Sequence, residues 1–98
     1  MFARVTTLEG GDPAELDESI RFAQEQILPR AREMEGWKGV ISLADRGTGT
    51  GLLITLWDSE EAMNASAEQA KGLRAEGQAA GGGGETAVRG YEVMVLET

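Results

Sequence analysis

Apolar side chains fall on both alternating faces of the segments that favour an extended chain. In residues 52–57, Leu53 and Trp57 occupy one face, and the other face carries three aliphatic residues. Residues 37–44 and 86–96 show the same double pattern, with Trp37 on the face of Ile41 and Leu43. Because successive side chains of a strand point to opposite sides of a sheet, a sheet made of these strands needs an apolar cover on each side.

Residues 2–8 favour a further strand, since this segment contains the β-branched residues Val5, Thr6 and Thr7. The next apolar positions recur at steps of three and four residues, which predicts an amphipathic helix over residues 12–34. Asp12 and Pro13 suit its capping and first positions, and Pro29 predicts a kink or a loosening of its last two turns. The apolar stripe consists of Leu16, Ile20, Ala23, Ile27, Ala31 and Met34.

A second helix is predicted to begin at Asp58, with Asp58 as its cap and Glu61 reaching back to it. The three glycines within residues 45–51 predict a turn, so the strands on either side form an antiparallel hairpin. We expect residues 1–98 to form one domain with the order β-α-β-β-α-β. This order predicts an α+β, ferredoxin-like fold, in which a four-stranded antiparallel sheet carries two helices on one face.

The composition argues against several classes of function. Nine Lys and Arg stand against 17 Asp and Glu, a net charge of −8, and the scattered basic residues argue against binding to nucleic acid or to an anionic membrane. The chain has no Cys and no His, so it lacks the usual ligands of zinc, iron–sulfur clusters and haem. We therefore expect no metal and no cofactor. Neither a membrane span nor a signal peptide is recognisable, so we expect a cytoplasmic protein.

Two helices can cover only one side of the predicted sheet, and 98 residues leave no material for a third layer. The other side still carries aliphatic residues. A second copy of the chain is the simplest cover for it. We therefore expect a homodimer that forms through the open sheet faces.

Two short segments resemble those of a known family. They are Glu35-Gly36-Trp37 before the second strand and Trp57-Asp-Ser-Glu-Glu-Ala-Met63 at the start of the second helix. Together with the element order, they resemble the antibiotic biosynthesis monooxygenase-like (ABM) family of dimeric α/β barrels. The resemblance covers nearly the whole chain and implies a ligand cavity between the helices and the sheet of each subunit. Its members include cofactor-independent oxygenases of polycyclic phenols, quinol oxygenases and haem-degrading enzymes.

Two departures from the family bear on activity. Many members place a His in the second helix, where this chain has Asn64 and its neighbours, and the haem-degrading members use an Asn on the first strand, where it has Val5-Thr6-Thr7. Haem degradation is therefore not expected. What the resemblance implies instead is a cofactor-free monooxygenase acting on a small apolar aromatic substrate of the phenol or quinol type. In that interpretation Asn64 is the catalytic donor to an oxyanion, and Trp57, Phe22 and Met63 surround the ring.

These candidate residues have structural alternatives. Trp57 can pack in the core instead of stacking on a ligand, and Asn64 can simply face solvent. Arg4 lies on the face of Phe2, Thr6 and Leu8; if that face is inward, Arg4 needs either a carboxylate such as Glu92 or an anionic ligand. Tyr91 is expected at the dimer seam or at the cavity mouth, with its hydroxyl in water. Trp37 is expected against a helix end or the second subunit.

The chain has two glycine-rich segments, residues 47–51 and residues 81–84. Residues 47–51 open no helix, which favours a hairpin turn over a phosphate-binding loop. Residues 81–84 predict a flexible link or a lid over the cavity.

The alternative function is a non-catalytic small-ligand-binding or regulatory dimeric module, similar to ACT-like amino-acid sensors, with its ligand at the subunit interface. The missing His and the lack of a matched acid–base pair favour this alternative.

Overall fold

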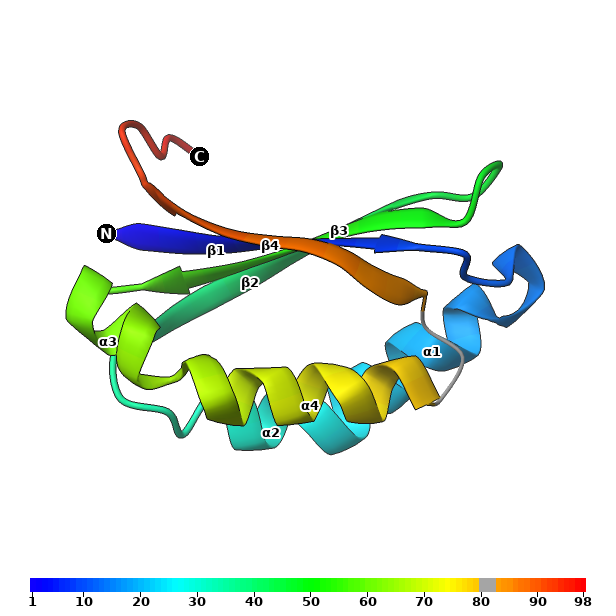
Figure 1. The fold of residues 1–98 in the computed structure, drawn as a ribbon, viewed down its shortest axis with the longest axis horizontal. Helices are drawn as coiled ribbons and strands as arrows, with labels where there is room; N and C mark the ends of the chain where they lie inside the picture. Colours follow the sequence, from blue (N-terminus) through cyan, green and yellow to red (C-terminus); the bar gives the residue numbers. More distant parts are fainter. Residues whose placement is uncertain (80–82) are drawn as a thin grey trace.

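A computed structural model describes residues 1–79 and 83–98. Within these ranges, β1 (Phe2–Glu9), β2 (Trp37–Asp45), β3 (Thr50–Trp57) and β4 (Gly84–Glu92) form one antiparallel sheet in the order β2-β3-β1-β4. The helices all lie against one face of this sheet (Figure 1). The ferredoxin-like fold is therefore confirmed. Two glycines of the predicted link at 81–84 lie outside the described residues.

The first helical arm is not one continuous helix. It consists of η1 (Pro13–Glu15), α1 (Leu16–Phe22), the π-helical segment η2 (Ala23–Ile27) and α2 (Leu28–Ala31). Asp12 caps it as predicted, because its side chain accepts a hydrogen bond from the Ala14 N–H at 2.9 Å. The π-helical turn ends directly before α2, in which Pro29 lacks the N–H that would continue the ladder. The loosening expected from Pro29 therefore takes the form of a widened turn.

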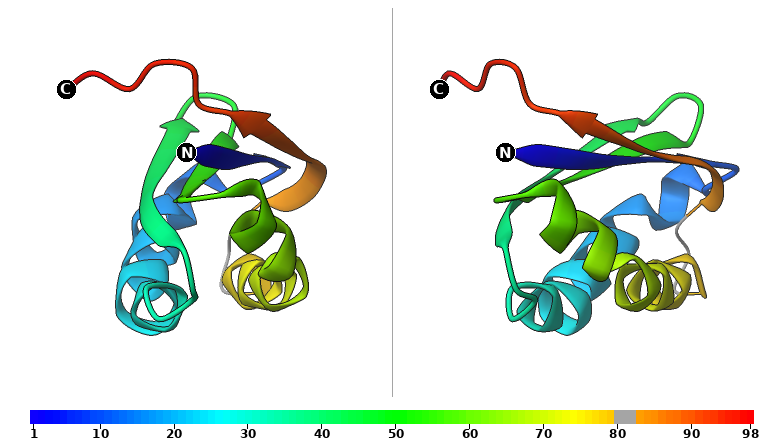
Figure 2. Two further views of the ribbon diagram at one scale, coloured as in Figure 1. Left: turned by 90° about the vertical axis from the view of Figure 1, so that its left-hand side faces the viewer. Right: turned by 60° about the vertical axis from the view of Figure 1, so that its left-hand side comes forward.

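The second arm is also divided, into α3 (Glu60–Ala65) and α4 (Ala67–Ala79). Ser59 caps α3, since its hydroxyl accepts from the Ala62 N–H at 3.1 Å. The predicted cap at Asp58 is wrong by one residue: the Asp58 N–H instead donates to the Gly36 carbonyl at 2.8 Å. The break falls at Ser66, whose hydroxyl donates to the Met63 carbonyl at 2.9 Å. The two arms lie side by side beneath the sheet (Figure 2).

The strand register sets which side chains face the helices. Arg4 pairs with Thr55 on one side and Gly90 on the other, and the face that they share is the one covered by the two arms. An irregularity between Trp37 and Gly39 places Trp37 opposite Trp57. Trp37 therefore shares the helix-covered face with Trp57, and its predicted position beside Ile41 is wrong because the shift reverses its side.

The core lies between the sheet and the arms. Its buried members are Ala31, Met34, Trp57, Met63 and Leu73, with Trp57 fully buried. The opposite face of the sheet has no cover in the described chain. Its side chains are half-buried at β3 and exposed toward the edges, including Ile41, Leu43 and Tyr91.

The last strand ends at Glu92, earlier than the predicted end at Leu96. Its pairing with β1 continues only through the Val93 N–H, which donates to the Met1 carbonyl at 2.9 Å. Beyond that bond the tail leaves the sheet on the side away from the helices (Figures 1 and 2). Met94, Val95 and Leu96 are therefore exposed. No helix of the described residues has the length and apolar character that a membrane crossing requires.

Candidate functional site

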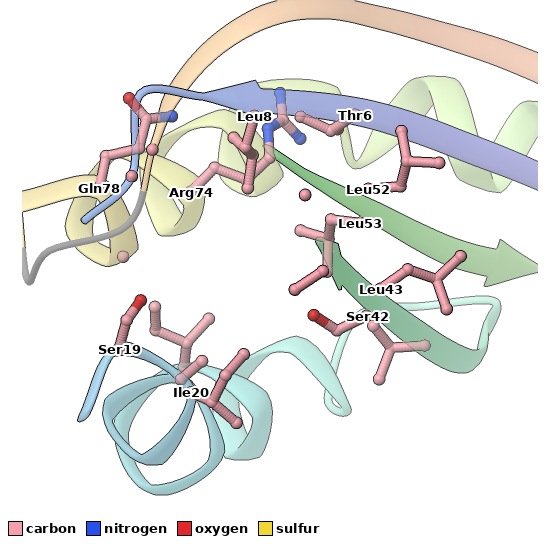
Figure 3. A pocket seen from close by; sticks show the side chains of 18 of the residues that line it. Thr6, Leu8, Ser19, Ile20, Ser42, Leu43, Leu52, Leu53, Arg74 and Gln78 are labelled. Atoms are coloured by element: carbon pink, nitrogen blue, oxygen red, sulfur yellow. The ribbon is translucent and has the colours of Figure 1, made fainter. Parts of the chain in front are cut away.

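A cavity of about 180 Å³ lies between the sheet and the two helical arms. Its wall is mainly apolar and comes from β1, β2, β3, the first arm and α4. Figure 3 shows Leu8 and Leu53 of the sheet facing Ile20 of the first arm across it. The π-helical segment contributes Ala23 and Ile27 to this wall. The widened turn before Pro29 therefore forms part of the cavity.

A few polar groups interrupt the apolar wall. Thr6, Ser19, Ser42, Arg74 and Gln78 contribute to it from four different elements (Figure 3). Asp12 and Asp45 also touch the cavity, but both are exposed and both accept backbone N–H groups of their own turns. Among the described residues that line the cavity, Arg74 is thus the one charged side chain away from the surface.

Arg74 reaches from α4 toward β1, where it lies beside Leu8 and Thr6 (Figure 3). Its Nε donates to Glu85 Oε1 of β4 at 2.7 Å, and the Arg74 side chain is 11% exposed. Since Glu85 engages Nε, the two terminal nitrogens of Arg74 are the atoms that can meet a ligand.

Arg4 lies one layer behind this wall. Arg4 is 6% exposed, and its guanidinium carbon lies 5.3 Å from the centroid of the Trp57 ring. Nη2 donates to the Met63 carbonyl and to Ser66 Oγ, the second at 3.1 Å. Nη1 is buried and has no hydrogen-bond partner in the described part of the chain. Thr6, the next residue on the same face of β1, and Trp57 both line the cavity.

Arg4 has no carboxylate counterion. The predicted partner, Glu92, is wrong: it lies opposite Phe2, two residues away, and is exposed. All 17 acidic residues belong to the described chain, and none forms an ion pair with Arg4. Burial, and secondarily the positive charge of Arg74, lower the pKa of Arg4 below its ordinary value. The environment of Arg4 therefore disfavours its own charge.

The structure gathers few of the predicted site residues around the cavity. Trp57 lines it, although its ring is also part of the core. Asn64 is exposed on α3, outside the cavity wall, because that short helix turns it toward solvent. Phe22 and Met63 are also outside the wall, and Met63 instead packs against Gly90 of β4. Tyr91 is 51% exposed on the open face of the sheet.

Sequence reasoning missed Ser66 and Arg74. Both lie on the apolar stripe of the second arm, where Met63, Ser66, Ala70, Leu73 and Gly77 recur at steps of three or four and Arg74 adjoins Leu73. A hydroxyl and a guanidinium on a buried stripe are costly unless they have partners. That conflict between residue type and position was the available signal.

The residues of the cavity do not fit haem or a metal ion. The chain has no His or Cys, and its single Tyr lies on the open face, so the usual iron ligands are missing from the wall. The cavity volume is also below the range of sites for drug-sized ligands, roughly 300–1,000 Å³. Within residues 1–79 and 83–98, no cluster of three or more Asp or Glu could hold a metal ion.

Sequence comparison finds relatives without an assigned role. The chain is 34% identical over 74 residues to the uncharacterized protein Rv2558 of Mycobacterium tuberculosis, a match that covers 76% of this chain and 31% of the relative. It is 31% identical over 96 residues to the uncharacterized protein Rv2557 of the same organism, a match that covers 98% of this chain and 42% of the relative. The chain thus spans less than half the length of these relatives. No family model matches the sequence.

Structural comparison identifies the fold. The monooxygenase from the gene ActVA-Orf6 of Streptomyces coelicolor, solved with nanaomycin D, matches with a TM-score of 0.67 and 18% identity, over 99% of this chain and 92% of that one. The haem degrader MhuD of Mycobacterium tuberculosis, solved with two haems in its active site, matches with a TM-score of 0.65 and 21% identity over the full length of both. A Chloroflexus aurantiacus structure assigned to the antibiotic biosynthesis monooxygenases matches with a TM-score of 0.65 and 16% identity, over 99% of this chain and 96% of that one. This chain has the fold of the ABM-like structures.

Proposed function

We propose that the cavity binds a small apolar aromatic molecule and that the protein oxidises it with O₂ without a cofactor. The apolar cavity between helices and sheet is the observation that carries this proposal. A cavity of about 150 Å³ is enough to hold benzene. A cavity of about 180 Å³ suits one ring, or two fused rings, better than a polycyclic ligand.

None of the described residues of the wall is a buried carboxylate or imidazole that could act as a general base. Its two carboxylates, Asp12 and Asp45, are exposed and bonded to their own turns. The proposed reaction therefore draws its electrons from a phenol or quinol that ionises in the cavity. In a phenol, the O–H and one ring C–H become the two C=O groups of a quinone while one O₂ is consumed and one H₂O is released, which balances atoms and electrons. The protein's part is to exclude water and to stabilise the oxyanion.

Oxygen uptake with a bicyclic quinol and with a bicyclic phenol tests this proposal. Ala23 lines the cavity from η2, so Ala23→Leu fills part of it. Ala75 is exposed on α4 and does not line the cavity, so Ala75→Leu is the matched control. We expect protein-dependent uptake that falls at least tenfold in Ala23→Leu and is retained in Ala75→Leu. Uptake no faster than autoxidation for both substrates would refute catalysis.

A second candidate is a non-catalytic ligand-binding module. The lack of a buried acid–base pair in the described cavity wall favours it. This candidate predicts ligand binding without oxygen uptake. If it is a sensor of the ACT-like kind, its ligand lies at a subunit interface, so binding that is lost in Ala23→Leu would count against that form of it.

We propose that residues 1–98 are one domain and that a second copy of the chain covers the open sheet face. Ile41, Leu43 and Tyr91 are 41%, 48% and 51% exposed on that face. The apolar tail beyond β4 lies on the same side (Figure 2). Monomeric proteins seldom leave a large continuous apolar surface uncovered, which supports a homodimer through this face.

A further inference from the structure

The buried guanidinium of Arg4 is not explained by the packing around it. One terminal nitrogen, Nη1, is buried without a hydrogen-bond partner among the described residues. A buried charge without a counterion is strongly destabilising, so native proteins seldom keep one without a purpose. The ring of Trp57 offers a cation–π contact at 5.3 Å, but this contact does not supply the acceptor that Nη1 lacks.

The local charges leave a net positive site. Thr6, the next residue after Arg4 on the inward face of β1, lies beside Arg74 (Figure 3). The charge of Arg74 contributes to the lowered pKa of Arg4, and Glu85 pairs only with Arg74. Of the two guanidinium groups, Arg74 at the cavity wall has one carboxylate partner, and Arg4 behind the wall has none. The chain as a whole is strongly acidic, with a net charge of −8, so this excess of positive charge is local.

The contacts of Arg4 within the protein are also dispensable. Its Nη2 donates to the Met63 carbonyl, but Ser66 Oγ donates to the same carbonyl at 2.9 Å. Loss of the Arg4 side chain would leave that acceptor satisfied. A purely structural role would instead require an acceptor that only Arg4 can serve.

We propose that Arg4 and Arg74 form an anion-binding end of the cavity, and that the ligand is a small apolar acid with one or two rings and a single oxyanion. Arg74 meets the oxyanion with its terminal nitrogens beside Thr6. Arg4 adds its uncompensated charge from one layer behind, where the low dielectric of the interior lets a charge act over several ångström. The oxyanion is a carboxylate or an ionised phenol; the apolar wall receives the ring.

This inference deepens the proposed function and rests on it only in requiring that the cavity bind an aromatic ring. It also explains how a phenol could ionise without a base. Two guanidinium groups near the hydroxyl favour the phenolate, which lowers the pKa of the bound phenol. The same two groups would hold a carboxylate by charge-assisted hydrogen bonds.

Binding of 2-naphthoate and of its methyl ester, measured by calorimetry, tests the charge preference. The two probes share the ring system and differ in charge. We expect the wild-type protein to bind the acid about tenfold more tightly than the ester, the factor that a charge-assisted hydrogen bond provides. Equal affinities, or a preference for the ester, would overturn the anion site and leave the aromatic cavity intact.

Arg4→Met tests the residue, and Arg21→Met is its control. Arg21 is exposed and pairs only with Glu18 among the described residues, so this variant makes the same charge change away from the cavity. We expect Arg4→Met to bind acid and ester equally, without a lower unfolding temperature in the absence of ligand. Arg21→Met should keep the tenfold preference. If Arg4→Met keeps it too, Arg4 is not part of the anion site and the proposal fails.

Glu85→Gln covers the case in which Arg4→Met does not fold. This change removes the carboxylate that pairs with Arg74 and keeps an amide oxygen for Arg74 Nε. We expect tighter binding of 2-naphthoate and unchanged binding of the ester. Weaker or unchanged acid binding would contradict the proposal.

A titration of 4-nitrophenol distinguishes the two oxyanions, because its ionised form is coloured. A lowered pKa of the bound phenol in the wild type, lost in Arg4→Met, indicates a phenolate ligand. Acid preference without that shift indicates a carboxylate. If neither naphthoate probe nor 4-nitrophenol binds, the aromatic cavity and the anion site are both refuted. Acid binding without oxygen uptake would refute only the catalytic part of the proposed function.

Discussion

The indole rings of Trp37 and Trp57 meet edge to face, with their centroids 5.6 Å apart and their planes at 89°. The two residues are paired across β2 and β3. Trp57 also donates its Nε1 to Thr55 Oγ1 at 3.0 Å and is fully buried. This pair therefore joins the edge of the sheet to the core and forms one end of the cavity wall.

Replacing Trp57 should cost more stability than any other single truncation in the core. We expect Trp57→Ala to lower the free energy of unfolding by about 3–5 kcal/mol, the range for large aromatic residues in protein cores. Urea denaturation at one fixed protein concentration would measure it. A double-mutant cycle with Trp37→Ala should give a coupling of about 0.5–1.5 kcal/mol for the ring pair. A coupling near zero would show that the edge-to-face contact adds nothing beyond burial.

A charge on the open face should separate the proposed dimer. Ile41→Glu places a carboxylate where a second sheet would bury it. Val88 is the matched control, because it is also 41% exposed but pairs with Thr6 on the helix-covered side. Light scattering after size-exclusion chromatography should give twice the chain mass for the wild type and Val88→Glu, and one chain mass for Ile41→Glu. A wild-type protein that elutes as a monomer at micromolar concentration would refute the dimer.

Much of the fold was predictable because its signals are local. The step of three and four residues identified the helical arms, and the cap at Asp12 fixed the start of the first arm. The errors arose where tertiary contacts decide. The irregularity beside Gly39 reversed the side of the sheet on which Trp37 lies. The Asp58 N–H donates to the Gly36 carbonyl, and the cap of α3 is Ser59 instead.

The site was much less predictable than the fold. A resemblance to a family pointed to Asn64, which the structure leaves exposed. Strand alternation placed Arg4 on the face of Phe2, Thr6 and Leu8, but neither the inward direction of that face nor the partners of Arg4 followed from it. They lie 59 and 62 residues away in the sequence, within α3 and at the break between α3 and α4. Their meeting depends on how that arm crosses the sheet, which no local pattern encodes.

Acid should weaken the contact between the two helical arms. Arg30 on α2 donates to both oxygens of Glu76 on α4, at 3.0 and 2.9 Å, and this hydrogen bonding lowers the pKa of Glu76 below its ordinary value of 4.5. A carboxyl whose pKa is depressed by folding stabilises the protein above its unfolded-state pKa, and the contribution is lost as pH falls through the folded-state pKa.

We therefore expect Glu76→Gln to be less stable than the wild type near neutral pH, with the difference vanishing as pH falls below about 4.5. Because the pair is exposed, salt should reduce the difference at neutral pH. Thermal unfolding across this pH range would measure it. Glu68→Gln is the control: Glu68 is exposed on the same helix and forms no ion pair within the described residues. A difference for Glu76→Gln that persists at pH 3 would contradict the role of the charge.

Two glycines should respond in opposite directions to the same added methyl group. Gly72 lies within α4, and a Cβ there would meet no atom within 4 Å. Alanine restricts the unfolded chain more than glycine does, so Gly72→Ala should raise the free energy of unfolding by about 0.5–1 kcal/mol. A decrease would mean that the space beside α4 is occupied in solution.

Gly36 is the counterpart, because its backbone has φ +83° and its carbonyl accepts the Asp58 N–H. A Cβ at Gly36 would lie 2.5 Å from Ala62 Cβ and 2.7 Å from Asp58 Oδ1. The contact with Ala62 cannot relax without moving the start of α3. The positive φ adds strain for any residue with a side chain. Gly36→Ala should therefore lower the unfolding temperature, whereas Gly72→Ala raises it. Met63, whose carbonyl accepts a hydrogen bond from Arg4, lies in α3. Gly36→Ala should therefore also weaken the preference of the cavity for the acid over the ester. An unchanged preference would show that the anion site does not depend on where α3 begins.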